Sequence, residues 1–482
     1  MILLTALAIA VVPPQTAEAA TRAAIERIQV RDGQIHAVIA VDPTAIDQAR
    51  AIDLSRKARG PLYGVPVLIK DNIEAKGPLA TTAGSLALAD NVTGRDAPLV
   101  ARLRAADAVI LGKTNLSEWA NYRSTHSSSG WSGVGGQTHN GHAIGRTPCG
   151  SSSGSGAAVA EGLVDAAIGT ETDGSITCPA AVNGVVGLKP TVGLVSRTHI
   201  VPISHSQDTA GPIARDVITA ARLLGAIAGS DPADPATVEA DKHKADYLAA
   251  LKPEALRGAR IGVVRLTTWS PEVAALFERA LDVLRRQGAV LVDVAPPANR
   301  DQISKAENIV LKTEFKVDVA AYLASTPQAV TSRTLADLIA FNKAHAAQEL
   351  SEFGQEKFEE AEATNGLDDP AYREALALSR KLAGAEGIDA MLAADHLVAL
   401  IAPTRGPAWM IDHINGDQSP PGGIGGMPAV AGYPHLTVPM GDVRGLPVGL
   451  SFIGPAWSEA TLLGLGFAFE QAAHVPPAPL AR

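Results

Sequence analysis

Short apolar runs that alternate with amphipathic helical patterns constrain the fold of this chain more than any other feature. Between Ala259 and Val294, the run RIGVV is predicted to be a strand, a helix follows with Pro271 near its start, and AVLVDV is predicted to be a second strand. Residues 21–41 and 98–112 each show a helix followed by a strand. This alternation is typical of an α/β sheet with helices on its faces.

The composition indicates a globular chain with a large core. Hydrophobic residues make up 46% and charged residues 19%, with 45 Gly and 32 Pro, which favours a packed core with many loops over disorder. The net charge is −9 and no block of Lys and Arg occurs, so we expect small neutral or cationic substrates and no nucleic-acid partner. A length of 482 residues allows about three domains or one large domain.

The first nineteen residues differ from the rest of the chain. An apolar stretch at residues 2–12 precedes two prolines and the small-residue sequence Ala17-Glu18-Ala19, as in a secretory signal with its cleavage site. A basic start is missing, and the apolar stretch is too short to span a bilayer. We expect residues 1–19 to be a signal peptide and the protein to be periplasmic or secreted. The alternative is an ordinary N-terminal helix and a cytoplasmic protein.

Lys70 is the first residue with unusual chemistry, because it follows the apolar run VPVLI, which is predicted to be a buried strand. Burial of an ammonium is costly, and desolvation favours the neutral amine, which can act as a base. The alternative is a strand-end lysine that reaches solvent or pairs with Asp71 or Glu74. Lys70 is therefore a candidate base that depends on partners elsewhere in the chain.

Two glycine-lined serine segments supply candidate partners. The first, CGSSSGSG at residues 149–156, runs into a helix-like segment, as a strand-to-helix loop does. It lacks the lysine of a P-loop and contains no Rossmann fingerprint, so nucleotide binding is not expected. The second, GTETDGSITCPAA at residues 169–181, follows a predicted strand and exposes the hydroxyl of Ser175 in a tight turn. Structural Ser/Gly turns are the alternative for both segments.

The second serine segment also offers hydrogen-bond donors. Its tight turn exposes the backbone N–H groups of Thr172, Asp173, Gly174 and Ser175, which are predicted to bind the oxyanion of a tetrahedral intermediate. A buried lysine and two loop serines are what a hydrolase needs to activate a hydroxyl without histidine or metal. The three segments together therefore indicate an amide-cleaving enzyme.

These segments resemble the amidase signature family motif by motif over residues 64–190. GVPVLIKDNI resembles its lysine segment, and CGSSSGSGAAVA with GTETDGSITCPAAVNGVVGLKPT resembles the signature itself. The resemblance continues through SQDTAGPIARD to AVAGYPHLTVPMG and GLPVGLSFIG, and so covers most of the chain. It implies the amidase-signature fold, which is one large α/β domain over residues 20–482 with a mixed central sheet covered on both faces by α-helices. The signature core is expected at about residues 64–216.

The resemblance also implies a role for each candidate residue. Ser175 corresponds to the nucleophile, Ser151 to a bridging serine that follows a cis peptide bond, and Lys70 to the base. Ser152 is expected to support them by hydrogen bonding. In this relay Lys70 takes a proton from Ser151, which takes one from Ser175 as that hydroxyl attacks the amide carbon and forms an acyl-enzyme. The resemblance implies no cofactor and no metal.

Three residues depart from the commonest family pattern. Cys149 and Asp173 stand where glycine is usual, and Thr177 stands where arginine is frequent. The segments around them are similar to those of bacterial peptide amidases, as are GLVSR at 193–197 and LADLIAFN at 335–342. This implies that a monomer or homodimer removes the C-terminal amide of short peptides and releases ammonia. The alternatives are a general aliphatic or aryl amidase, an amidotransferase-type subunit, and a noncatalytic binding protein of the same fold.

The two cysteines and the histidines receive structural interpretations. Cys149 and Cys178 are expected to be small buried packing residues, and a disulfide between them is possible. His139 and His142 lie in a glycine-rich loop without a third spaced ligand, so we expect hydrogen bonds rather than a metal site.

Overall fold

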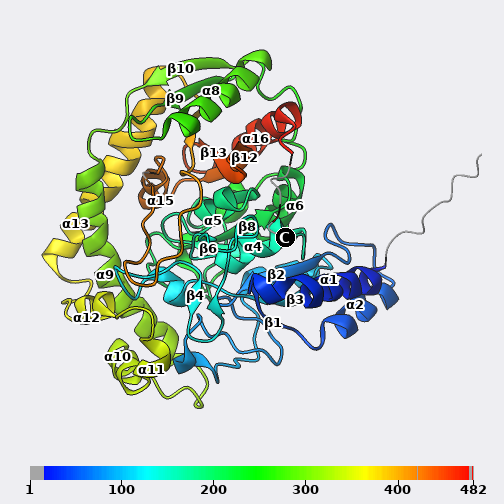
Figure 1. Cartoon of the computed structure of the whole chain (residues 1–482), viewed down its shortest axis with the longest axis vertical. Helices are drawn as coiled ribbons and strands as arrows, with labels where there is room; N and C mark the ends of the chain where they lie inside the picture. Colours follow the sequence, from blue (N-terminus) through cyan, green and yellow to red (C-terminus); the bar gives the residue numbers. More distant parts are fainter. Residues whose placement is uncertain (1–15, 421, 477–479, 481–482) are drawn as a thin grey trace, which may run out of the picture.

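Within residues 16–420, 422–476 and 480, which the computed structural model describes, one eleven-stranded mixed sheet runs through the protein (Figure 1). Its strands lie in the order β1-β3-β2-β6-β8-β7-β12-β13-β11-β9-β10. They are β1 (Val38–Val41), β2 (Pro66–Lys70), β3 (Val109–Thr114), β6 (Ala166–Glu171), β7 (Val186–Lys189), β8 (Thr209–Ala214), β9 (Arg260–Val264), β10 (Val290–Val294), β11 (Ala399–Pro403), β12 (His435–Val443) and β13 (Leu446–Ile453). A separate short pair is formed by β4 (Trp131–Ser132) and β5 (Gly136–Gln137).

The sheet combines parallel and antiparallel neighbours. β2 pairs in parallel with β3 and β6, and β9 pairs in parallel with β10 and β11, whereas the strands from β6 through β8, β7, β12 and β13 to β11 pair antiparallel. The carboxyl ends of β2 and β6 therefore lie at one edge of the sheet, and these ends carry Lys70 and the turn to Ser175. The predicted α/β class with a mixed sheet is confirmed.

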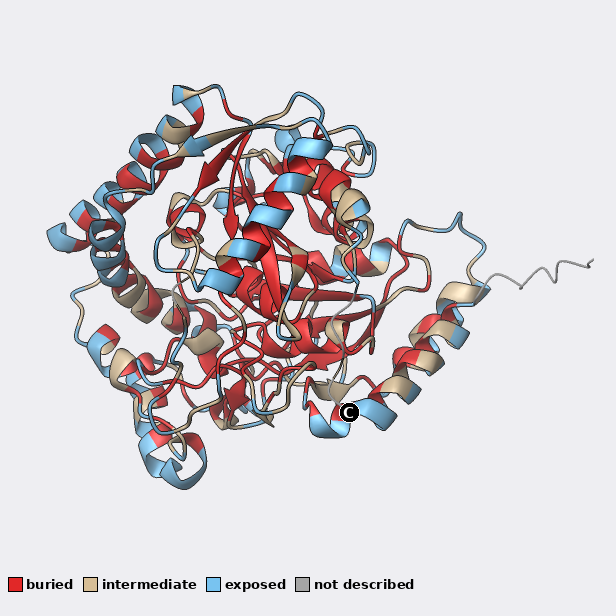
Figure 2. Ribbon diagram, turned by 45° about the horizontal axis from the view of Figure 1, so that its top comes forward, coloured by how far each residue is buried: buried red, intermediate tan, exposed pale blue. Residues whose placement is uncertain are grey.

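Helices cover both faces of the sheet because successive strand residues point to opposite sides. In β2, Val67 and Ile69 join the core on one face, whereas Leu68 joins the core on the other. The first face is covered by α3 (Pro98–Ala105), α6 (Val217–Ile227), α8 (Pro271–Arg286) and α16 (Glu459–Ala473). The second face is covered by α1 (Ala17–Arg31), α2 (Ala45–Leu54), α4 (Ser153–Ala160) and α5 (Thr177–Val182). Figure 2 shows the strands buried and the outer faces of the helices exposed.

The remaining helices form a layer beside the sheet, along the left of Figure 1. They include the long helix α9 (Arg300–Ala324), and α10 (Leu335–Ala344), α11 (Ala346–Glu349), α12 (Glu356–Glu362), α13 (Pro370–Ala383), α14 (Ala390–Ala394) and α15 (Gly426–Ala431). The short helix α7 (Ala240–His243) follows α6. Single helical turns lie at η1 (Asp32–Gln34), η2 (Leu86–Leu88), η3 (Glu118–Asn121), η4 (Pro235–Thr237) and η5 (Gly384–Asp389). No helix among the described residues combines the length and hydrophobicity of a bilayer span.

Only the last residues of the predicted signal peptide belong to the described part of the chain. Residues 1–15 of the predicted signal peptide lie outside the described residues, and α1 begins at Ala17. Ala17 is buried, and its N–H and that of Glu18 donate to the carboxylate of Asp53. The predicted boundary after Ala19 therefore falls in the first turn of α1.

Two segments differ from the local expectation. Residues 418–428 are predicted to be a loop, but α15 begins within them at Gly426. The polar run at residues 349–369 is predicted to be a solvated helix face, yet Phe358 and Ala361 of α12 are fully buried, and the Leu86 N–H donates to the buried carboxylate of Glu349. Tertiary packing, which short polar stretches do not reveal, decides both segments.

Candidate active site

Lys70 lies at the carboxyl end of β2 with no exposed surface. Its Nζ donates to Ser151 Oγ at 2.7 Å, to Thr170 Oγ1 at 2.8 Å and to the Thr170 carbonyl oxygen at 3.3 Å. Thr170 belongs to β6, next to β2 in the sheet. The alternatives of a solvent-exposed lysine or a pair with Asp71 or Glu74 are therefore excluded.

The environment of Lys70 favours the neutral amine. Burial lowers the pKa of Lys70 to about 7, although the nearby carboxylates of Asp208 and Glu171 act in the opposite direction. Burial also raises the pKa of Asp208 to about 6. Near neutral pH a substantial fraction of Lys70 is therefore unprotonated and can accept a proton.

The loop that carries Ser151 leads into α4 and is hydrogen-bonded to β6. The peptide bond between Gly150 and Ser151 is cis, as the resemblance implies. Ser152 Oγ donates to the Thr170 carbonyl oxygen at 3.0 Å and accepts the Thr170 N–H at 3.2 Å. Ser152 thus fastens the loop to Thr170 of β6, the residue that also accepts hydrogen bonds from Lys70.

Ser175 lies in the turn between β6 and α5, and it is linked to the serine loop through the backbone. The Ser152 N–H donates to the Ser175 carbonyl oxygen at 3.1 Å. Among the described residues, no side-chain hydrogen bond joins the Ser175 hydroxyl to Ser151. Lys70 and Ser151 are therefore in direct contact, and Ser175 is their backbone-linked neighbour.

Glu171 shapes the turn ahead of α5. Its Oε2 accepts the N–H groups of Ile176 at 2.7 Å and Thr177 at 2.9 Å, and the Thr177 hydroxyl lies within hydrogen-bond distance. Gly174 adopts φ +76°, a conformation that favours glycine. The buried carboxylate and the glycine together hold the turn on which Ser175 is presented.

The turn leaves a set of backbone donors free. Among the described residues, no acceptor is found for the N–H groups of Thr172, Asp173, Gly174 and Ser175. Orphan backbone donors are rare in buried parts of a protein and are available to an anion or a developing oxyanion. The four predicted donors are thus unpaired beside the candidate nucleophile.

A cavity of about 670 Å³ opens beside this turn. Asp173, Gly174, Thr177 and Cys178 line one side of it. The opposite walls come from α9 and from residues 422–427. The glycine-rich loop near the C-terminus is therefore part of a substrate-sized cavity rather than a plain connection.

Cys149 and Cys178 are joined by a disulfide, which the sequence left open. Both are buried, as expected of packing residues, and they pack with Val182, Ala408 and Trp409. Cys149 precedes Ser151 by two residues and Cys178 follows Ser175 by three. The bond therefore ties the serine loop to α5, which follows the turn of Ser175.

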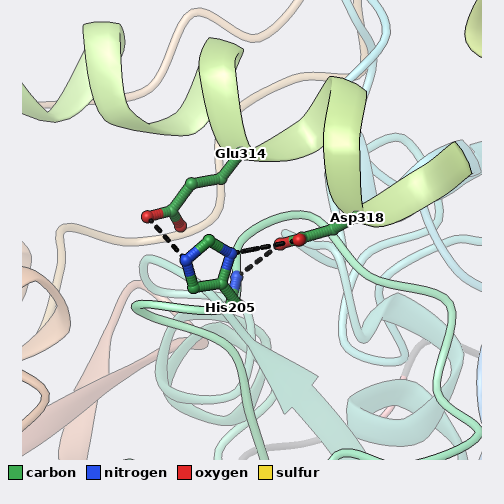
Figure 3. Close-up of side chains that lie close together, drawn as sticks. All are labelled: His205, Glu314 and Asp318. Carbon is green, nitrogen blue, oxygen red and sulfur yellow. Dashed lines mark hydrogen bonds and ion pairs between the residues drawn. The ribbon is translucent and has the colours of Figure 1, made fainter. Parts of the chain in front are cut away.

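His205 and two carboxylates of α9 anchor another loop near the turn of Ser175. Figure 3 shows His205 between Asp318 and Glu314 of α9. His205 Nδ1 lies 2.9 Å from Asp318 Oδ2, Nε2 lies 3.4 Å from Glu314 Oε1, and the His205 N–H donates to Asp318 Oδ2 at 2.7 Å. Glu314 also accepts hydrogen bonds from Ser206 N and the Tyr372 hydroxyl. These atoms thus already have protein partners.

The loop held by His205 carries two residues that contact the turn at residues 172–175, which we call the oxyanion turn after its predicted role. Thr172 Oγ1 donates to Asp208 Oδ1 at 2.5 Å, and Gln207 Nε2 donates to the Thr172 carbonyl oxygen at 3.4 Å. The two histidines singled out in the sequence make hydrogen bonds, as expected: His139 with the Ile144 carbonyl oxygen and His142 with the Asn183 carbonyl oxygen.

Sequence reasoning missed several residues that surround the relay. Thr170, Glu171 and Asp208 contact the catalytic candidates or act on their charge. Thr170 and Glu171 lie inside the recognised motif, where an acidic residue just ahead of a turn with free N–H groups was an available signal. Asp208 and Glu307 of the cavity wall come from distant segments, and no local pattern marks them.

Comparisons with known proteins agree with this geometry. The amidase family model matches residues 19–463. The crystal structure of native peptide amidase from Stenotrophomonas maltophilia is similar with a TM-score of 0.92 at 52% identity, covering 97% of this chain and 96% of that one. A probable amidase of Arabidopsis thaliana is 40% identical over 94% of this chain and 86% of its own length.

The similarity extends to another activity within the same fold. A glutamyl-tRNA(Gln) amidotransferase subunit from Moorella thermoacetica is 37% identical over 95% of this chain and 93% of its own length. Every one of these matches spans most of both proteins. The chain belongs to the amidase signature family and is an enzyme that hydrolyses amides.

Proposed function

We propose that the protein removes the C-terminal amide of short peptides through a Ser-Ser-Lys relay and an acyl-enzyme. The observation that carries the relay is the 2.7 Å contact between the buried amine of Lys70 and Ser151 Oγ. The substrate class is supported by the similarity to peptide amidase and by a cavity large enough for a short peptide.

The first half-reaction forms the acyl-enzyme. Ser175 Oγ attacks the amide carbon and gives its proton to Ser151, while Ser151 gives its own proton to the neutral amine of Lys70. The negative charge that develops on the carbonyl oxygen is stabilised by the free N–H groups at residues 172–175. The C–N bond then breaks as the nitrogen accepts the proton returned through Ser151, and ammonia leaves.

The second half-reaction regenerates the enzyme. Water attacks the Ser175 ester and passes a proton through Ser151 to Lys70. The tetrahedral intermediate collapses, Ser175 recovers its proton, and the peptide leaves as a free carboxylic acid. The backbone of the peptide stays uncut.

The proposal is tested by incubating the purified protein with amidated dipeptides, the same peptides as free acids, and simple aliphatic amides, while ammonia and peptide products are measured. We expect ammonia from the dipeptide amides in amounts equal to the peptide acid. Turnover of aliphatic amides with inert dipeptide amides would indicate a general amidase instead.

Two variants assign the nucleophile. Ser175→Ala is expected to lose turnover while retaining its melting temperature, because only a small hydroxyl is removed. Ser127→Ala is the matched control, since Ser127 is a buried serine that makes no hydrogen bond to Lys70, Ser151 or Ser175 among the described residues, and it is expected to retain turnover. Activity retained in Ser175→Ala would overturn the assignment.

We also propose that the protein is exported to an oxidising compartment. Beyond the N-terminal signal, the disulfide between Cys149 and Cys178 supports export, because disulfides persist mainly outside the cytosol. N-terminal sequencing of protein from the native host is expected to show loss of the leader. An intact Met1 would contradict export.

A further inference from the structure

Three acidic side chains line the cavity beside the turn of Ser175: Asp173, Glu307 and the exposed Asp301. Asp173 comes from the turn that carries Ser175, and Glu307 comes from α9 on another wall. Among the described residues, neither Asp173 nor Glu307 forms an ion pair. Asp173 makes no hydrogen bond to a described residue either, and its side chain is exposed to the cavity. The cavity thus contains two acidic groups, Asp173 and Glu307, that have no direct cationic partner among the described residues.

Glu307 is 8% exposed, and a hydrogen bond holds its side chain in place. Its Oε1 accepts a hydrogen bond from Gln207 Nε2 at 2.9 Å, and the same nitrogen donates to the Thr172 carbonyl oxygen. Glu307 is therefore connected through one amide to the oxyanion turn. Burial disfavours the ionised form of Glu307, although the charge of Lys357 acts in the opposite direction, so Glu307 ionises more readily when a ligand supplies a positive charge.

The pKa values of both carboxyl groups are raised, as expected for acidic groups that lack a bound cation. Burial, with the neighbouring Asp173 carboxylate, raises the pKa of Glu307 to about 8. Asp173 is open to the cavity but surrounded by protein atoms, and this desolvation, with the Glu171 carboxylate, raises the pKa of Asp173, although Arg405 and Lys189 act in the opposite direction. A bound cation would lower the pKa of both carboxyl groups and favour their ionised forms. The ionised carboxylates would in turn attract the cation.

A further polar side chain, His435, lines the same cavity. His435 is buried and Nε2 lies 2.6 Å from Ser451 Oγ, whereas no hydrogen-bond partner is found for Nδ1 among the described residues. Burial lowers the pKa of His435 to about 3, so its ring is neutral and adds no positive charge. An unpartnered buried nitrogen is the kind of atom that a bound ligand satisfies.

The arginines of the cavity do not neutralise the pair by direct contact. Arg300 donates to the Gly423 carbonyl oxygen, and the guanidinium of Arg405 lies over the Trp409 ring at 5.7 Å from its centroid. Arg405 acts on Asp173 through its charge but lies outside ion-pair distance. Neither arginine therefore forms a direct ion pair with Asp173 or Glu307.

We propose that Asp173 and Glu307 bind a primary ammonium group on the acyl half of the substrate, which makes short peptide amides with a free N-terminus the preferred substrates. The inference rests on the proposed amide hydrolysis at Ser175. Asp173 precedes Ser175 by two residues, a span of at most about 7 Å along the backbone. The α-ammonium of an extended dipeptide amide lies at a similar distance, about 7 Å, from the amide carbon that is attacked.

The experiment compares three substrates that differ in their ammonium group. They are alanyl-leucine amide, its N-acetyl derivative, and N-acetyl-lysyl-leucine amide. The first carries an α-ammonium, the second carries no cation, and the third carries a side-chain ammonium at the same residue. The value of kcat/KM is measured by ammonia release for each substrate with the full chain.

The preference for a cationic substrate is then measured in Asp173→Asn and Glu307→Gln. Both variants keep the size of the side chain and remove its charge. We expect the ratio of kcat/KM for the free dipeptide amide over its acetylated form to fall by about tenfold in each variant, mainly through KM, because close charge pairs in a cavity are strong. Asp90→Asn is the matched control, since it removes an exposed carboxylate that does not line this cavity and is expected to keep the ratio.

The acetylated substrate separates the possible outcomes. A fall in the ratio with the acetylated substrate still hydrolysed supports the ammonium site, even where the oxyanion turn is slightly disturbed. If the lysyl substrate responds like the free dipeptide amide, the site binds both an α-ammonium and a side-chain ammonium. An unchanged ratio in both variants overturns this inference alone. Failure of the wild type to hydrolyse any of the three overturns the proposed function and the inference with it.

Discussion

At the scale of single residues, the chemistry depends on the position of one amine. Lys70 is fully buried and contacts only neutral oxygens within hydrogen-bond distance, so its protonated form lacks the direct ion pair that normally stabilises a buried cation. The nearby carboxylates of Asp208 and Glu171, which make no ion pair with Lys70 among the described residues, offset part of this loss. The balance places the amine where it can exchange protons near neutral pH, which is the condition for a general base.

The proposed role of Lys70 predicts a pH profile. Burial lowers its pKa to about 7, and only the unprotonated amine accepts a proton, so kcat/KM is expected to rise with pH through about 7. Lys70→Arg keeps a cation at every accessible pH and is expected to lower kcat by about 100-fold or more. Lys305→Arg on the exposed face of α9 is the control. A flat profile between pH 5.5 and 8.5 would contradict the role of Lys70 as the base.

At the scale of elements, the site depends on ties between segments that are far apart in the chain. The disulfide joins the serine loop to α5, and His205 joins the loop of Gln207 and Asp208 to α9. Neither tie touches the reacting atoms, yet both position elements that do. Their removal is therefore expected to change stability and positioning together.

The first tie predicts sensitivity to reduction. The disulfide closes a loop with a sequence separation of 29 residues, and the chain-entropy account gives such a loop about 3 to 4 kcal/mol of stabilisation. Replacing both Cys149 and Cys178 by serine is expected to lower the free energy of unfolding by that amount and to lower kcat. Urea unfolding and ammonia release measure the two effects. The wild type treated with a thiol reductant should behave like the variant, and an unaffected wild type would argue against the bond.

The second tie predicts a stability effect that depends on pH. The hydrogen bond with Asp318 raises the pKa of His205, so the folded protein binds its proton more tightly than the unfolded chain does. The stabilisation is fully present below the unfolded pKa of about 6.5 and is lost as pH rises through the folded pKa. Replacing His205 by glutamine is therefore expected to destabilise the protein more at pH 5.5 than at pH 9.

A double-mutant cycle checks the partner of His205. The variants are His205→Gln, Asp318→Asn and the double substitution, and each is unfolded in urea at both pH values. A coupling energy between the two residues that shrinks at pH 9 agrees with the charged pair. Equal coupling at both pH values would show that the contact does not depend on protonation.

At the scale of the whole molecule, one continuous sheet joins the two ends of the chain into a single core. β2 carries Lys70 and β6 leads into the turn of Ser175, the residues of the proposed relay, whereas β12 and β13 come from the C-terminal part and lie in the same sheet. Phe452 of β13 is fully buried and packs against Phe469 of α16, with ring centroids 6.1 Å apart. A cavity opened there affects the sheet on which the catalytic residues stand.

Phe452→Ala is expected to lower the free energy of unfolding by about 3 to 5 kcal/mol, because the removed ring leaves a cavity in a packed core. Far-UV circular dichroism and tryptophan fluorescence are expected to shift together, since the sheet is shared by the whole chain. Ile414→Ala removes a side chain that is 89% exposed and is the control, with an expected change within about 0.5 kcal/mol. Separate transitions for the two probes would show that the halves unfold independently.

The sequence by itself determined the features that are encoded over short distances. The strand before Lys70, the two serine turns and the alternation of strands and helices each follow from neighbouring residues, and the structure has them where the patterns predict. The tertiary structure alone decided what surrounds them, because burial and charge at a point depend on segments distant in the chain. The depth at which Lys70 is buried, the pairing of Cys149 with Cys178 and the approach of Glu307 to Asp173 all arise when those segments pack against one another.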